Sequence, residues 1–250
     1  MERRGQCIAV VSGKGGTGKT SFTAGVSAAL AQSGKRVLCL DCDVGLRNLD
    51  LALGLSDRAL MDFSDVAQNR CPLAAAVVEH PHLPGLFLLT APVRSRGRPA
   101  TEEQMAKLLR DIRERFDYCL LDAPAGLGMG FLLSTAAADR CVVVTTTDAS
   151  SLRDAQHTVM ELKRFPNGSL HLIVNRVRKK MLRQLHATID DAIDKAGLPL
   201  LGVVPEDDAL PLSLNRGVPL LLADSGMAAT AYRNIAKRIQ GIHVPLLRIK

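Results

Sequence analysis

Eight residues near the N-terminus, GKGGTGKT at positions 13–20, leave few folds open to this chain. They satisfy the pattern G-x-x-x-x-G-K-[ST], follow an apolar run that begins at Cys7, and precede the helical sequence TSFTAGVSAALAQSG. A strand, a glycine-rich loop and a helix in this order direct backbone N–H groups and the positive end of a helix dipole at one point, which suits phosphate oxygens. A chance glycine-rich turn would not explain the full pattern in this setting. The sequence therefore predicts a phosphate-binding loop.

The rest of the chain alternates short aliphatic runs with helical patterns. The runs are apolar without strict alternation, which indicates strands buried on both faces, and their alternation with helices predicts βαβ units. We expect an α/β fold with a mostly parallel, doubly wound sheet and helices on both faces, in the P-loop NTPase architecture. The expected strands are 7–11, 36–41, 86–91, 118–123, 141–146, 170–175 and 200–205, and the expected helices are 20–34, 59–68, 101–116, 150–164, 183–197 and 227–240.

Neither an inter-domain linker nor an internal repeat interrupts this pattern. We therefore expect one P-loop domain over residues 1–241, followed by a short C-terminal tail over residues 242–250. With 250 residues, 47% of them hydrophobic, the chain is long enough for one substantial core.

Composition narrows the cellular setting of the protein. The net charge of +7 favours anionic partners such as nucleotides, nucleic acid or acidic membrane surfaces. Cys39 and Cys42 form a CxxC, but no second pair or histidine cluster completes a metal site, so we interpret them as packing residues with reduced thiols. The N-terminus enters a strand at once, and no apolar run reaches the roughly 18 residues of a membrane span. We expect a cytoplasmic protein that can also contact the inner face of the cell membrane.

Acidic side chains at strand ends offer ligands for a metal ion. Asp41 and Asp43 close one predicted strand and Asp122 closes another, and open α/β sheets bind ligands at the carboxyl ends of their strands. Buried carboxylates are costly without a cation, which Mg²⁺ would supply. In a P-loop, Lys19 reaches the β- and γ-phosphates and the Thr20 hydroxyl ligates Mg²⁺. The alternative is a set of capping aspartates with no metal.

Five segments together resemble the deviant Walker A ATPases of the MinD/ParA family. The loop matches K-G-G-x-G-K-[ST], and DCDVGLRNLDLALGL at residues 41–55 is similar to the family's switch I segment. DAPAG (122–126), SSLRDA (150–155) and LLGVVPEDDALPLSLNRGVPLL (200–221) follow in the family's order. The resemblance covers residues 7–241, is strongest for the MinD branch of septum-site-determining ATPases, and has GLRNLD as its most specific part.

This resemblance implies a switch that hydrolyses ATP with Mg²⁺ and forms a homodimer around ATP. Lys14 then reaches across the dimer to the phosphates of the other subunit's nucleotide, as a cation supplied in trans. Asp43 orients the attacking water, with Asn48 near it. Asp41 and Asp122 lie in the Mg²⁺ shell, Asp122 through a water molecule. Without the resemblance, Lys14 is equally well an exposed loop lysine with no contact.

ATP and Mg²⁺ are the expected cofactors. Asn175 ends a predicted strand where relatives read adenine through an asparagine amide, although a turn residue is its alternative, and Pro205 and Asp207 are weaker candidates. The expected nucleotide-binding set is Gly13, Lys14, Gly15, Gly16, Thr17, Gly18, Lys19, Thr20, Ser21, Asn175, Pro205 and Asp207. The expected catalytic set is Lys14, Lys19, Asp43 and Asn48, and the expected metal set is Thr20, Asp41 and Asp122.

The resemblance also implies protein partners, namely a division inhibitor and an ATPase-stimulating protein, which dock near residues 150–154. MinD proteins usually end in a basic amphipathic helix that enters the membrane. Here Pro245 interrupts the tail, which offers only Leu246, Leu247 and Ile249 beside two cations. We expect weak or partner-assisted membrane contact at most, with a frayed or packed extension as the favoured alternative.

The basic run RVRKKMLRQLH at residues 176–186 keeps another function open. A ParA-like ATPase that binds DNA and positions a cargo or a flagellum would use such a surface, although most charge runs are simply solvated, and DNA is the less favoured partner. A scaffold that holds ATP without turnover and a metabolic P-loop enzyme are weaker interpretations. The complete set of acidic and basic site residues argues against the scaffold, and the GLRNLD run argues against the metabolic enzyme.

Overall fold

The computed structural model describes residues 4–56, 58–93, 99–184, 188–223 and 226–247. Its eight-stranded sheet has the order β3-β4-β2-β5-β1-β6-β7-β8. Every neighbouring pair is parallel except β3 with β4. The strands are β1 (Gln6–Val11), β2 (Val37–Asp41), β3 (Val78–Glu79), β4 (Leu86–Leu89), β5 (Tyr118–Asp122), β6 (Arg140–Thr145), β7 (Leu170–Val177) and β8 (Leu200–Pro205).

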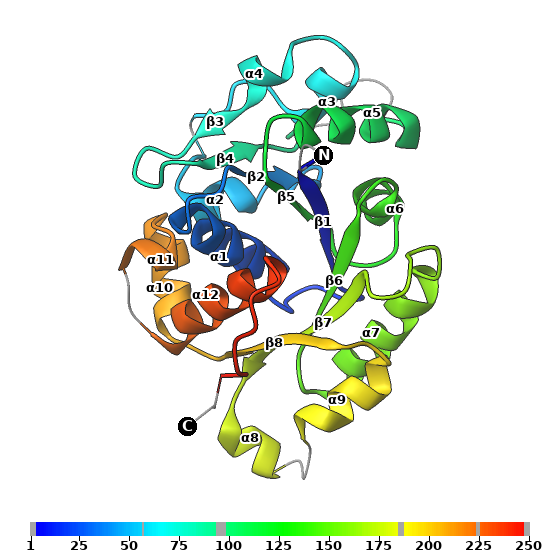
Figure 1. Cartoon of the computed structure of the whole chain (residues 1–250), viewed down its shortest axis with the longest axis vertical. Helices are drawn as coiled ribbons and strands as arrows, with labels where there is room; N and C mark the ends of the chain where they lie inside the picture. The colour runs from blue at the N-terminus through cyan, green and yellow to red at the C-terminus, as the bar shows by residue number, and fades with distance from the viewer. Residues whose placement is uncertain (1–3, 57, 94–98, 185–187, 224–225, 248–250) are drawn as a thin grey trace.

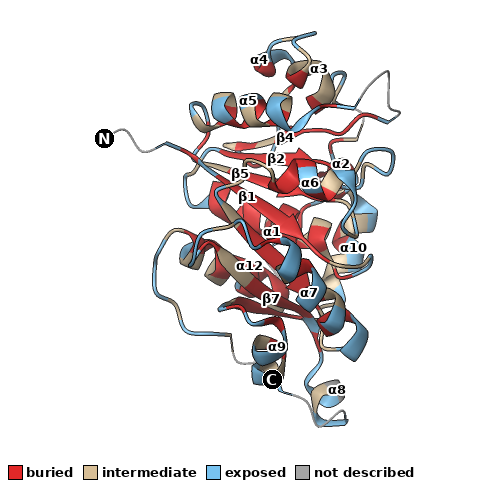
Figure 2. Ribbon diagram, turned by 90° about the vertical axis from the view of Figure 1, so that its right-hand side faces the viewer, coloured by how far each residue is buried: buried red, intermediate tan, exposed pale blue. Residues whose placement is uncertain are grey.

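Helices cover both faces of this sheet (Figure 1). The helices are α1 (Lys19–Gln32), α2 (Leu49–Leu53), α3 (Phe63–Ala67), α4 (Leu73–Ala76), α5 (Glu102–Arg113), α6 (Met129–Thr135), α7 (Ala149–Glu161), α8 (Lys179–Gln184), α9 (Ile189–Ala196), α10 (Ala209–Arg216), α11 (Leu220–Ala223) and α12 (Met227–Ile239). On β1, Ile8 and Val10 pack on the side of α1 and α12, whereas Ala9 and Val11 pack on the side of α7 and α9. The predicted doubly wound α/β fold is therefore confirmed, with the sheet buried between two helical layers (Figure 2).

Local sequence signals set where several helices begin. Thr101 caps α5 as expected: its hydroxyl accepts from the N–H of Gln104 at 3.2 Å, and the Gln104 side chain accepts from the Thr101 N–H at 2.9 Å. This reciprocal pair is a capping box, which satisfies two N–H groups that the helix itself cannot. Thr188 caps α9 in the same way with Asp191.

Two predicted helices are shorter than expected. The helix expected over 59–68 is only α3, because a capping box of Asp62 and Asp65 starts it and Asn69, with φ of 57°, follows its end. The helix expected over 183–197 corresponds to the end of α8, which stops at Gln184, and to α9, which begins at Ile189; residues 185–187 lie outside the described residues. The sequence pattern also missed β3 and the short helices α2, α4, α6, α8, α10 and α11, whose lengths are too small for a clear hydrophobic period.

The two cysteines of the CxxC are packing residues in this structure. Cys39 and Cys42 are buried free thiols, and burial raises the pKa of Cys39 to about 12.

Residues 242–247 follow α12, where the Arg238 guanidinium donates to the Val244 carbonyl at 2.6 and 3.0 Å. Leu247 packs on the core whereas Ile242 and Leu246 are exposed, so the described part of the tail is packed on the domain only in part. Within the described residues, no helix combines the length and the apolarity needed to cross a membrane.

Candidate nucleotide-binding site

The glycine-rich loop joins β1 to α1 at the carboxyl edge of the sheet. Lys19 opens α1 and is 8% exposed, and its Nζ donates to Ser12 Oγ at 2.8 Å. Burial lowers the pKa of Lys19, while the charges of Asp122 and Asp43 act in the opposite direction. A buried ammonium with one neutral acceptor is ready to take an anionic ligand.

Glycine is required at position 18 for two reasons. Gly18 has φ of 88°, in the left-handed region that L side chains rarely adopt, and a Cβ there would lie 2.3 Å from Asn175 Nδ2. The Asn175 amide occupies this space because its Nδ2 donates to the Thr17 carbonyl at 2.8 Å. The strand end at Asn175 is thus packed directly on the loop, which places a predicted base-reading residue beside the predicted phosphate-binding residues.

Asn175 also carries an acceptor that has no partner among the described residues. The side chain is 2% exposed, and its Oδ1 is buried with no hydrogen-bond donor in that part of the chain, as is Thr17 Oγ1 nearby. Buried polar atoms are almost always paired, so this orphan acceptor calls for a ligand donor. Asn175 lines a cavity of about 300 Å³, together with residues that include Gly16, Gly18, Ser21, Pro205 and Leu210. The cavity and the orphan acceptor fit a nucleobase with an exocyclic amine.

Asp207 lines the same cavity, but both of its oxygens are committed to backbone. Oδ1 accepts from the N–H of Ala209 at 3.0 Å, and Oδ2 accepts from the N–H of Ala228, at the start of α12, at 3.1 Å. The carboxylate therefore joins the loop after β8 to α12. It shapes the cavity through that loop.

The predicted metal ligands converge behind the loop. Asp41 and Asp122 are register partners at the ends of β2 and β5. The Thr20 hydroxyl donates to Asp122 Oδ2 at 2.7 Å, and Thr23 donates to the other oxygen at 3.3 Å. Asp41 accepts from the N–H groups of Asp43, at 2.8 Å, and Leu49, at 3.2 Å.

The positive charge near the two strand-end carboxylates, Asp41 and Asp122, does not offset the cost of burying them in the charged form. Burial, reinforced by the charge of Asp122, raises the pKa of Asp41 to about 7. Burial raises the pKa of Asp122 to about 6 despite the Thr20 hydrogen bond. A divalent cation would relieve this cost, and Thr20, Asp41 and Asp122 could hold it with water and phosphate oxygens completing its shell. Among the described residues there is no cluster of three or more His, Cys, Asp or Glu side chains that could hold a metal ion.

Two predicted switch I residues occupy different surroundings. Asp43 is partly buried, and burial raises its pKa while the Lys19 charge lowers it, which places Asp43 on the loop side of the site. Asn48 is exposed at the N-cap of α2, and its side chain makes no capping hydrogen bond. The structure therefore brings Asp43 toward Lys19, whereas the Asn48 side chain makes no hydrogen bond to the loop among the described residues.

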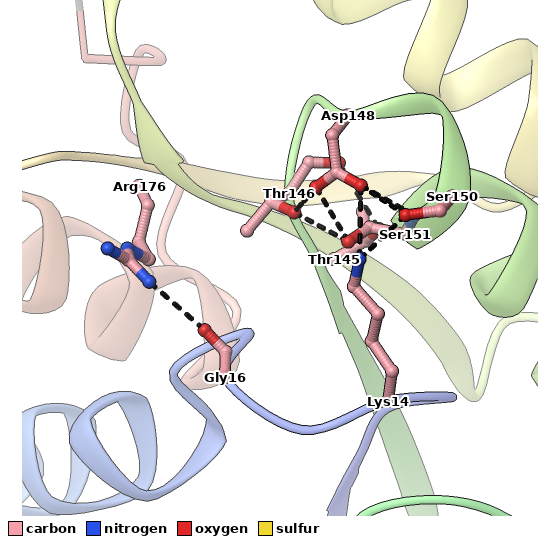
Figure 3. A network of polar contacts seen from close by, with 8 residues as sticks. All are labelled: Lys14, Gly16, Thr145, Thr146, Asp148, Ser150, Ser151 and Arg176. Carbon is pink, nitrogen blue, oxygen red and sulfur yellow. Dashed lines mark hydrogen bonds and ion pairs between the residues drawn. The ribbon is translucent and has the colours of Figure 1, made fainter.

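Lys14 lies on the other flank of the loop, against the start of α7. Its Nζ is 3.1 Å from Asp148 Oδ1 and 2.8 Å from Ser150 Oγ (Figure 3). Burial alone would raise the pKa of Asp148, but hydrogen bonds from Thr146, Ser150 and Ser151 hold it well below its usual range. Sequence reasoning missed Asp148 as a partner of the loop; the signal available was its position as an N-cap before a helix, which says nothing about Lys14.

A second cavity, of about 460 Å³, lies between this flank and β7, with Lys14, Thr147 and Arg176 in its lining. A larger hollow of about 670 Å³ lies apart from it, beside Arg47, Met61 and Val93, and none of the predicted site residues lines it. Loop residues Gly16, Gly18 and Ser21 and the orphan acceptor's residue Asn175 line the 300 Å³ cavity, so this cavity defines the candidate site.

This combination of sheet order, glycine-rich loop and strand-end carboxylates defines a class of nucleotide-binding proteins. The model of the CobQ/CobB/MinD/ParA nucleotide-binding domain matches residues 8–220, and the chain belongs to this family. Within the family, the septum site-determining protein MinD of Synechocystis is 40% identical over 244 residues, which cover 96% of this chain and 91% of that protein.

Solved structures agree with this placement. The MinC:MinD cell division protein complex of Aquifex aeolicus contains a chain with a TM-score of 0.89 and 35% identity, covering 97% of this chain and 98% of that one. MinD of Pyrococcus horikoshii, solved in complex with Mg-ADP, has a TM-score of 0.82 and 28% identity, covering 94% and 95%. The resemblance to the MinD branch is therefore confirmed.

Proposed function

We propose that this chain is an ATP-dependent dimerising ATPase switch that acts in placement of the bacterial division site. The observation that carries the ATPase assignment is the Thr20 hydroxyl, 2.7 Å from Asp122, directly behind a loop with a buried Lys19. That arrangement is what phosphoryl transfer with Mg²⁺ requires of a P-loop. The division-site assignment is supported by relatives that are septum site-determining proteins.

The residues of the loop and the strand ends divide the chemistry between them. Residues 13–21 hold the phosphates through backbone N–H groups, and Lys19 neutralises charge on them. Thr20, Asp41 and Asp122 hold Mg²⁺, which when bound stabilises the charge that develops during phosphoryl transfer. Asp43 accepts a hydrogen bond from the attacking water and thereby orients it, and Asn48 approaches that water only if switch I moves.

The base pocket favours adenine in this proposal. No described residue donates to Asn175 Oδ1, and the exocyclic amine of adenine supplies a donor, whereas guanine presents a carbonyl oxygen at the same place. Pro205 borders the pocket at the end of β8, and Asp207 holds the loop that closes it. ATP is therefore the expected nucleotide rather than GTP.

Lys14 gives the switch its two states. In the free protomer it is tied to Asp148 and Ser150 of its own chain. In the ATP-bound homodimer it leaves them and neutralises phosphate charge on the other subunit's nucleotide, as an arginine finger does. Loss of the γ-phosphate removes that attraction, and Lys14 returns to its own α7.

The switch works with partners in this proposal. The Aquifex MinC:MinD complex supports a division inhibitor as one partner. In this proposal an ATPase-stimulating protein is the other partner, and the start of α7 is the docking region. The protein is cytoplasmic and contacts the membrane weakly or through a partner. A DNA-binding positioning ATPase is the second candidate, supported by the exposed Lys179, Lys180 and Arg183 of α8, for which the described residues provide no ion pair.

The test combines nucleotide binding with the state of assembly. Wild-type protein is expected to bind MgADP by calorimetry and to become a dimer with ATP by light scattering, whereas Lys19→Ala loses nucleotide binding because the phosphates lose their buried cation. Unchanged ATP affinity in Lys19→Ala would refute the P-loop assignment. ATP-dependent binding of duplex DNA that weakens with salt would instead favour the second candidate.

A further inference from the structure

Arg176 stands next to Asn175 in a distorted part of β7. Its φ is 55°, in the left-handed region that non-glycine residues rarely adopt. The pairing of β7 with β8 shifts at this point: Val174 pairs with Val203, but Val177 pairs with Pro205, so three steps on β7 match two on β8. One extra residue on one strand is the definition of a β-bulge, and bulges next to functional sites redirect a side chain.

The redirected side chain is that of Arg176. In a regular strand, neighbouring side chains point to opposite faces. Here, Asn175 Nδ2 donates to the Thr17 carbonyl at 2.8 Å, and Arg176 Nη1 donates to the Gly16 carbonyl at 3.2 Å. Two consecutive residues of β7 therefore hold two consecutive peptide units of the phosphate loop. This is possible because the bulge brings Arg176 to the same side as Asn175.

The hydrogen bond from Arg176 to the Gly16 carbonyl also orients the peptide unit that joins Gly16 to Thr17. A trans peptide unit is planar, with its carbonyl and its N–H pointing in opposite directions. When Arg176 holds the Gly16 carbonyl, the N–H of Thr17 must point away from Arg176. In the same way, the hold of Asn175 on the Thr17 carbonyl turns the N–H of Gly18 away from β7. Phosphate loops bind through such N–H groups, and their orientation before the ligand arrives decides how much ordering the ligand must cause.

The same guanidinium also reaches the segment beside the base cavity. Arg176 Nη2 lies 3.2 Å from Glu206 Oε1, and the N–H of Glu206 donates to Val177 at 3.1 Å. Arg176 lines both the 300 Å³ base cavity and the 460 Å³ cavity beside Lys14. Figure 3 shows Arg176 and Lys14 on opposite flanks of the loop, one reaching Gly16 and the other reaching away to Asp148.

We infer that Arg176 is a positioning residue of the nucleotide site, which holds the phosphate loop at a fixed place relative to the base pocket before nucleotide binds. The inference rests on the proposed function, because it names a further residue of the same ATP site. The ion pair to Glu206 is half-exposed and contributes little by itself. The effect comes from the hydrogen bond to Gly16, with Glu206 orienting the guanidinium.

The chain offers a matched control in Arg178. Its Nε also pairs with Glu206, and these two arginines together lower the pKa of that carboxyl, Arg178 contributing first. Arg178 lines the cavity beside Lys14 but makes no hydrogen bond to the loop among the described residues. Arg178→Ala therefore removes one cation and one Glu206 partner while leaving the hold on Gly16 in place.

The first readout uses the nucleotide-free protein. In Arg176→Ala we expect faster hydrogen–deuterium exchange at the amides of Thr17 and Gly18, and in Arg178→Ala we expect wild-type exchange there. The second readout is the dissociation constant of MgADP by calorimetry. It should rise about five- to tenfold in Arg176→Ala, as expected for the loss of one solvent-exposed hydrogen bond, and stay unchanged in Arg178→Ala.

A conservative variant separates positioning from charge. Arg176→Lys keeps the cation but lacks a planar fork that serves Gly16 and Glu206 together, so it should remain weakened for MgADP. Wild-type affinity in Arg176→Lys, or wild-type exchange at Thr17 and Gly18 in Arg176→Ala, would overturn the inference. If wild-type protein binds no MgADP, the proposed function fails, and the exchange experiment still decides whether Arg176 holds the loop.

Discussion

The contact between Lys14 and Asp148 makes a quantitative prediction about assembly. Their side chains are 37% and 51% exposed, and exposed ion pairs contribute about 0.2–1 kcal/mol. Losing that contribution raises the fraction of protomers with a free Lys14 by a factor of about 1.4 to 5. The proposed ATP dimer uses two such lysines, so Asp148→Ser should tighten it about 2- to 30-fold.

Serine is the informative replacement at this position. Asp148 caps α7 by accepting from the N–H of Ser151 at 2.9 Å, and alanine would lose that cap at a cost of about 1 kcal/mol. Serine is also a good N-cap residue, but its shorter side chain withdraws from Lys14. Ser150→Ala is the control, because it removes the neutral partner of Lys14 at 2.8 Å and leaves the carboxylate in place.

Sedimentation equilibrium with a non-hydrolysable ATP analogue measures the dimer constant without turnover. Asp148→Ser should dimerise more tightly than wild type, Ser150→Ala should change less, and Lys14→Ala should remain a monomer. A Lys14→Ala protein that dimerises like wild type would refute the role of Lys14 in trans. An Asp148→Ser protein with weaker dimerisation would show that Asp148 supports the dimer instead of restraining the free protomer.

Three further changes test other parts of the site. Gly18→Ala should abolish nucleotide binding by calorimetry and lower the melting temperature, since its Cβ would meet Asn175 Nδ2 at 2.3 Å at a φ of 88°; normal binding would contradict the packing. Asp43→Ala should bind ATP and dimerise but release phosphate at least tenfold more slowly, and normal turnover would remove its role with water. Burial lowers the pKa of His80, against the hydrogen bond from its ring to the Leu53 carbonyl, so the folded state binds fewer protons than the unfolded state just below about pH 6.5. The free energy of unfolding should therefore fall as the pH drops through that range, and His80→Gln should reduce this slope in urea titrations at pH 7 and pH 5.5.

The fold was predictable because its signals are local and repeated. Each aliphatic run is long enough to identify a strand, and each of the predicted strands is present within a residue or two. The phosphate loop was predictable from spacing alone, since Gly18 and Lys19 must occupy fixed places between a strand and a helix. Short helices such as α2 and α6 escaped because five to seven residues show too little of a 3.6-residue period.

Site residues were harder to assign when their partners are distant in sequence. Asp207 was expected near the nucleotide base, and it lines the 300 Å³ cavity beside Asn175. Its carboxylate oxygens, however, accept hydrogen bonds from the backbone N–H groups of Ala209 and Ala228. The role of Asp148 depends on how the loop after β6 meets Lys14, 134 residues earlier. The bulge at Arg176 depends on the register between two strands, which the letters VNRV do not reveal.

In the proposed switch, these distant contacts place the responses to nucleotide and to a partner on the same few atoms. Lys14 is tied to Asp148 and Ser150, and Ser150 also lies in the region where a partner is expected to dock. A partner that occupies the start of α7 must then compete with Lys14 or stabilise the state in which Lys14 has left Asp148. By linkage, ATP must change the affinity for that partner by the same factor by which the partner changes the affinity for ATP. Because the contact is exposed and weak, the coupling is small per protomer, and in the proposed ATP dimer it is larger because two such lysines contribute.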